Sequence, residues 1–142
     1  MRASANVPRI TVPVNGFLVL GTLLLTGEER TTYSQPIVPR SPFNPRRPIE
    51  SPGAWELVAR TSRLRLSPVI FTPGANQLAD PATNSPGATE LTVGSNWYLT
   101  AWVRVQFNWE RSWFDQPVRL GPGPQGLLTG QNALLTRFQV IF

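Results

Sequence analysis

The segment from Glu90 to Phe114, ELTVGSNWYLTAWVRVQFNWERSWF, decides the fold, because its side chains alternate between two faces. In its first half, the apolar Leu91, Val93 and Trp97 alternate with more polar residues. In its second half, one face carries Arg104, Gln106, Asn108 and Glu110, and the other face carries Ala101, Val103, Val105, Phe107 and Trp109. A period of two predicts a β-hairpin or one long bent pair of strands. We expect the tight connection near residues 98–100.

The segments that flank this hairpin also indicate strands. GFLVLGTLLLTGEER (residues 16–30) is apolar almost throughout, and NALLTRFQVIF (residues 132–142) alternates up to the last residue. GAWELVARTSRLRLSP (residues 53–68) alternates as well, but its phase slips near Arg63, which predicts a β-bulge or the rim of a barrel. Fifteen Pro and eleven Gly interrupt any long helical period.

These patterns predict an all-β fold, an antiparallel β-meander of four or five strands of about ten residues each. We expect residues 1–142 to form a single region. Long Pro-rich loops are expected at about residues 34–52, 68–88 and 115–131.

The composition narrows the possible functions. The chain has no Cys and no His, so disulfides, thiolate metal sites and the commonest general base are excluded. All 13 basic residues are Arg, and the net charge is +5, but the arginines are scattered rather than gathered on a helix. No pair of carboxylates has a spacing suited to hydrolysis. We therefore expect neither an enzyme nor a nucleic-acid-binding protein, and no metal or cofactor.

Three kinds of β protein fit the alternation. A strand of about 9–11 residues crosses a bilayer when tilted, and a polar inner set with aromatic residues at the ends of the strands is typical of membrane barrels. Trp55, Trp97, Trp109 and Trp113 are the candidates for such interfacial aromatic residues. A small soluble β-sandwich that binds an anionic ligand or partner would also alternate around its core, and so would an oligomeric barrel built from several copies.

Four motifs then point to one family. LLLTGEERTTY, GAWELVARTSRLRL, NWYLTAWVRVQFNW and LLTRFQVIF, in this order, resemble the late strands of the phosphate-selective porin O and P family. The resemblance implies a homotrimeric transmembrane β-barrel in the bacterial outer membrane, in contact with lipid, for passive diffusion of small anions such as phosphate. The end of the chain, with Phe142, Val140 and Phe138, resembles the signal by which such barrels are assembled.

The resemblance also implies which residues line the pore. Arg60, Arg104 and Arg137 fall on the inward phase and would favour anions. Glu56, Gln106 and Glu110 share that face. Alternatively, Glu56 and Glu110 pair with these arginines and only hold neighbouring strands together.

A complete barrel of this family has more strands than four or five. An open sheet in lipid would leave backbone groups unsatisfied at its edges, at several kcal/mol each. We therefore expect the chain to be the C-terminal part of a porin, and the lack of a recognisable signal peptide agrees with that expectation.

Overall fold

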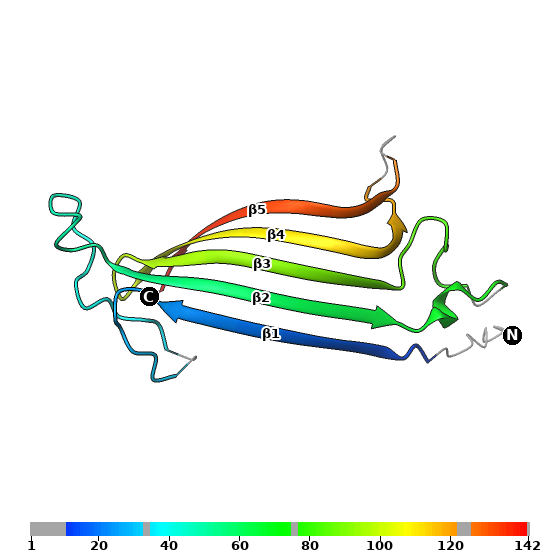
Figure 1. Ribbon diagram of the computed structural model, residues 1–142, viewed down its shortest axis with the longest axis horizontal. Helices are drawn as coiled ribbons and strands as arrows, with labels where there is room; N and C mark the ends of the chain where they lie inside the picture. Colours follow the sequence, from blue (N-terminus) through cyan, green and yellow to red (C-terminus); the bar gives the residue numbers. More distant parts are fainter. Residues whose placement is uncertain (1–10, 33–34, 75–76, 122–125, 142) are drawn as a thin grey trace, which may run out of the picture.

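The computed structural model describes residues 11–32, 35–74, 77–121 and 126–141. They form one five-stranded sheet in which each strand is antiparallel to the next (Figure 1). The strands are β1 (Val14–Leu24), β2 (Ala54–Leu66), β3 (Gly87–Tyr98), β4 (Val103–Val118) and β5 (Leu128–Val140). The predicted all-β antiparallel meander is confirmed, and the strands, at 11 to 16 residues, are longer than expected.

The sheet is open. Its strand order is β1-β2-β3-β4-β5, so within the described residues the outer edges of β1 and β5 have no neighbour. The single helical element is the short 3-10 helix η1 (Pro68–Phe71) in the described part of the chain. None of the described helical segments has the length and the apolar character needed to cross a membrane.

The strand register defines two faces, because directly paired residues point to the same side of a sheet. We call one side the polar face. It carries the even-numbered residues of β1 to β3, those of β4 up to Ser112, and the odd-numbered residues of β5. The other side, which we call the apolar face, carries the remaining strand residues, up to Trp113 in β4.

The first and third long loops differ in length from the expectations, and the second agrees closely with its expected bounds. The turn between β3 and β4 occupies residues 99–102, slightly later than predicted. Thr100 stabilises this turn, because its Oγ1 accepts hydrogen bonds from the backbone N–H groups of Trp102 and Val103, both at 3.1 Å. The first two loops span residues 25–53 and 67–86. The third spans only residues 119–127, because β4 continues to Val118 and β5 starts at Leu128.

Of the two explanations expected for the change of phase near Arg63, the β-bulge is wrong, and the rim of a barrel stays a prediction. β2 keeps an unbroken register with both neighbours along its whole length. The register shifts instead between β4 and β5, after Trp113, where Pro117 has no N–H to donate to a ladder. The change of phase in β2 has another cause: Leu64 and Leu66 line a hollow on the polar face together with residues of the adjacent loops.

The two ends of the sheet are distinct (Figure 1). At one end, which we call the C-terminal end, β5 finishes at Val140, next to the β3–β4 turn and the long loop 25–53. The other two loops lie at the opposite end. The loop 25–53 packs onto the sheet: Ile37 is buried against Ala54 and Tyr98, and Phe43 donates its backbone N–H to the Leu99 carbonyl at 2.7 Å.

Candidate functional site: the polar face of the sheet

The polar face brings the six residues expected to line a pore onto one side of the sheet. Glu56, Asn96, Gln106 and Arg137 form one row across four strands, through direct pairs of the register. Neighbouring rows contain Arg60 with Thr92 and Glu110, and Tyr98 with Arg104 and Gln139. The period of two within each strand, together with the regular register between strands, places these side chains on a common face.

Glu56 is the centre of a hydrogen-bond network at the C-terminal end of this face. Its side chain is only 1% exposed, and its two oxygens accept bonds from Arg30 (2.6 Å), Asn96 (2.8 Å) and Tyr98 (2.7 Å). The network extends to β4, because Gln106 Nε2 donates to Asn96 Oδ1 at 2.7 Å. A carboxylate with this many donors is held ionised and in one orientation.

Arg30 is the residue of this network that the sequence did not indicate. It lies in the loop 25–53, outside any alternating segment, and reaches both Glu56 and the Tyr98 hydroxyl, at 3.4 Å. Partial burial alone would lower the pKa of Arg30, but the hydrogen bonds to Tyr98 and Glu56 outweigh this effect and raise the pKa above its ordinary value. Arg30 therefore stays fully charged and attaches its loop to the sheet.

Arg60 forms a second charged cluster in the middle of the polar face. It pairs with Glu90, donates to Thr92 Oγ1 at 3.1 Å and lies 3.8 Å from a Glu110 oxygen. The alternative expectation is that Glu56 and Glu110 pair with the expected pore-lining arginines and hold neighbouring strands together. Glu110 meets this expectation in part, through its contact with Arg60. Glu56, in contrast, pairs with Arg30 rather than with one of the three expected arginines.

Arg104 and Arg137 are the two arginines of this face without an acidic partner in the described part of the chain. Arg104 donates to the neutral Gln139 Oε1 at 2.5 Å, and its guanidinium lies 5.5 Å from the centroid of the Tyr98 ring. Arg137 is exposed, and no hydrogen bond or ion pair joins its side chain to the described residues. These two positive charges are therefore not neutralised locally.

A smaller polar contact fixes the start of the loop 25–53. Glu28 accepts hydrogen bonds from the Thr26 hydroxyl and, at 3.1 Å, from the backbone N–H of Arg40. Partial burial would raise the pKa of Glu28, but these hydrogen bonds outweigh it and hold the pKa below its ordinary value.

The described residues leave most of the apolar face uncovered, although Phe43 of the loop 25–53 packs edge-on against Trp97 at the C-terminal end, with ring centroids 4.8 Å apart. Leu134 is 83% exposed, Phe138 66% and Leu23 61%, and large apolar side chains of all five strands are exposed on this face. Val140 and Phe138, named in the expected assembly signal, both lie there, while Phe142 lies outside the described residues.

The four candidate interfacial tryptophans all lie on the apolar face, at different distances from the ends of the sheet. Trp55 and Trp97 are directly paired at the C-terminal end and stack with ring centroids 5.0 Å apart, and Trp113 is near the opposite end. The expected position of Trp109 at the end of a strand is wrong. It pairs with Val93 and Leu134 in the middle of the sheet, because β4 is longer than the alternating segment suggested.

The described residues contain no group of three or more Asp or Glu side chains placed to hold a metal ion. Comparisons of the chain with protein-family models, with curated proteins and with solved structures found no match.

Proposed function

We propose that the five strands form part of a porin β-barrel in the bacterial outer membrane, which lets small anions such as phosphate diffuse through it. One observation carries this proposal: from β2 to β5 one face of the sheet holds most of the charged and hydrogen-bonded side chains, and the other face exposes apolar side chains of all five strands, while β1 is apolar on both faces. In a barrel that spans a membrane, the first face lines the water-filled lumen and the second contacts lipid. As a full barrel, the protein would assemble as a homotrimer.

The dimensions of the apolar face support a membrane location. Trp113 lies eight positions after Val105 in β4, and Val105 pairs with Trp97. This spacing corresponds to about 27 Å along a strand and to about 21 Å along the membrane normal at the usual tilt of about 40°. The apolar band of outer-membrane barrels is about 25 Å tall and has aromatic residues at both borders.

The open edges support further strands as partners of this sheet. Unpaired N–H and C=O groups in lipid cost several kcal/mol each, so β1 and β5 need neighbours in the membrane. Additional strands or further copies of this chain would supply them and close the barrel.

The charges of the polar face support a preference for anions. Four arginines (Arg30, Arg60, Arg104 and Arg137) face three glutamates (Glu56, Glu90 and Glu110). Arg30 and Arg60 are compensated by ion pairs, whereas Arg104 and Arg137 keep their charge available. Uncompensated positive charge on the wall of a pore favours the entry of anions.

A soluble β-sandwich is less well supported. It would require a second layer over the apolar face, and the described residues form one sheet with large apolar side chains exposed on that face.

The proposal is tested by the reversal potential of the membrane-assembled protein in a planar bilayer under a potassium phosphate gradient. We expect a conducting pore whose reversal potential lies toward the equilibrium potential of the anion. A reversal potential toward that of potassium, or a bilayer that stays non-conducting with the protein inserted, would contradict the proposal.

A further inference from the structure

The apolar face is not uniform along its length. In β2 it carries Trp55, Leu57 and Ala59, then Thr61, and finally Arg63 and Arg65. The same change occurs in β4, where Phe107 and Trp109 are followed by Arg111. Basic side chains therefore gather on this face near the end opposite the C-terminal end, beyond the apolar middle.

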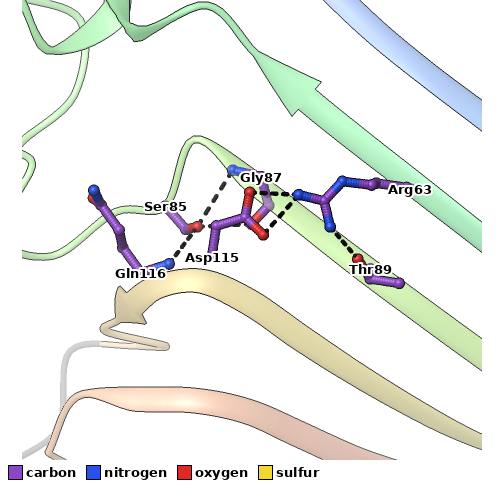
Figure 2. Close-up of polar contacts among 6 residues, drawn as sticks. All are labelled: Arg63, Ser85, Gly87, Thr89, Asp115 and Gln116. Carbon is purple, nitrogen blue, oxygen red and sulfur yellow. Dashed lines mark hydrogen bonds and ion pairs between the residues drawn. The ribbon is translucent and has the colours of Figure 1, made fainter.

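The local contacts hold two of these arginines in place. Arg63 donates to both carboxylate oxygens of Asp115, at 3.0 and 2.9 Å, and to Thr89 Oγ1 at 2.7 Å (Figure 2). The guanidinium of Arg111 lies 5.5 Å from the centroid of the Trp113 ring, a cation–π distance. Arg65 is exposed, and neither it nor Arg111 has an ion pair with the described residues.

The spacing along β2 places these charges at the height of lipid headgroups. Arg65 lies ten positions after Trp55 in β2. This is about 33 Å along a strand and about 25 Å along the membrane normal at a tilt of about 40°. If Trp55 lies at one border of the hydrocarbon, Arg65 lies at the other, where lipid phosphates begin.

We propose that Arg65 and Arg111, which lie on either side of the level of Trp113 along the sheet, form a docking surface for the phosphate groups of anionic lipids. Arginine suits this task, because its planar group binds phosphate oxygens through two parallel N–H groups and stacks on aromatic rings. Arg63 and Asp115 neutralise each other and serve as the support of this surface. The inference rests on the proposed membrane location, but it adds a ligand outside the pore.

The test compares full-length variants in their partitioning into phosphatidylcholine vesicles with and without phosphatidylglycerol. The double variant Arg65→Gln/Arg111→Gln removes the two available charges. The double variant Arg46→Gln/Arg47→Gln is the matched control, because it removes two exposed charges from the loop 25–53 at the other end.

We expect the wild-type chain to prefer the anionic vesicles, and the Arg65/Arg111 variant to lose about 30-fold of that preference, from the usual contribution of basic residues at an anionic surface. The control should stay within about threefold of wild type, since its charges lie outside the docking surface.

Other results would overturn the inference in distinguishable ways. An equal loss of vesicle preference in both double variants would mean that positive charge attracts anionic lipid non-specifically. No loss in either variant would mean that these arginines do not bind lipid, and the proposed membrane location would be unaffected. If dissolved inorganic phosphate abolished the preference for anionic vesicles while sulfate at the same ionic strength left it unchanged, the arginines would bind a phosphate ion from solution rather than a lipid. Failure to bind either kind of vesicle would overturn the membrane location as well.

Discussion

The carboxylate of Asp115 lies in the space that a side chain at Gly87 would fill. A β-carbon built on Gly87 would be 2.5 Å from Asp115 Oδ2, while the same oxygen accepts a hydrogen bond from Arg63 at 2.9 Å. Ser85 fastens the surrounding backbone, because its hydroxyl accepts bonds from the N–H groups of Gly87 and Gln116 (Figure 2). Because Gly87 in β3 has no side chain, Asp115 near the end of β4 can reach across β3 and pair with Arg63 of β2.

This relationship predicts that Gly87→Ala displaces Asp115 and breaks its pair with Arg63. We expect a loss of about 1–3 kcal/mol in the free energy of unfolding, from the clash and the lost charge-assisted bonds. Urea unfolding in detergent micelles measures it. Gly21→Ala is the control, because nothing lies within 4 Å of its added carbon. Equal effects of the two substitutions would mean that the Asp115 contact has no special weight.

Glu56→Gln should be strongly destabilising. A glutamine at this buried position leaves Arg30 without its ion pair and turns an amide NH₂ toward the donors Asn96 and Tyr98. We expect a loss of about 2–4 kcal/mol in the free energy of unfolding.

The control for Glu56 is Glu50→Gln, whose ion pair with Arg47 is exposed and should contribute less than about 0.5 kcal/mol. Urea unfolding measures both variants. A Glu56→Gln protein as stable as the control would show that the network at the C-terminal end of the polar face does not hold the sheet.

Arg137→Gln should reduce selectivity while leaving stability unchanged. Its side chain is exposed and forms no bond with the described residues, so we expect less than about 0.5 kcal/mol in the free energy of unfolding. A unit charge in a watery lumen acts over several ångströms, so its removal should lower the permeability ratio of anion to cation by about two- to threefold. Reversal potentials give this ratio, with Arg46→Gln as the control. An unchanged ratio would place Arg137 outside the ion pathway.

The attachment of the loop 25–53 should weaken in acid. The folded protein holds the pKa of Glu28 below the ordinary value of 4.5, so the contribution of Glu28 is present above that pH and is lost as the pH falls through the folded pKa. The stability difference between wild type and Glu28→Gln should therefore be largest near neutral pH and shrink below pH 4.5. Urea unfolding at a series of pH values checks this. A difference that is constant with pH would mean that the charge of Glu28 is irrelevant.

The strands and their faces could be predicted from the sequence for a simple reason. Side chains of a strand alternate strictly, so the positions of Arg60, Arg104 and Arg137 on one face follow from their spacing within each strand and from a regular register between strands. All four strand pairings keep a regular register, up to Trp113 in β4. This regularity is why those expectations agree with the structure.

The contacts of the site could not be predicted in the same way. Arg30 comes from a Pro-rich loop without periodicity, so nothing in the sequence indicated that it would reach Glu56. Which charges pair depends on the register between strands, and the hydrophobic pattern does not choose between Glu90 and Glu110 as the partner of Arg60. The prediction that Trp109 lies at the end of a strand is wrong because the alternating pattern does not show where β4 ends.

The measurement that tests the central claim most directly is the depth of each tryptophan in a bilayer. Full-length variants that keep one tryptophan, with the others replaced by Phe, are assembled into vesicles whose lipids carry bromine at different depths along the acyl chain. If the apolar face contacts lipid, bromine near the bilayer centre should quench Trp109 most, and bromine near the headgroups should quench Trp97 and Trp113 most. If the four tryptophans of the apolar face all responded equally weakly to bromine at every depth, the result would contradict a membrane-facing sheet.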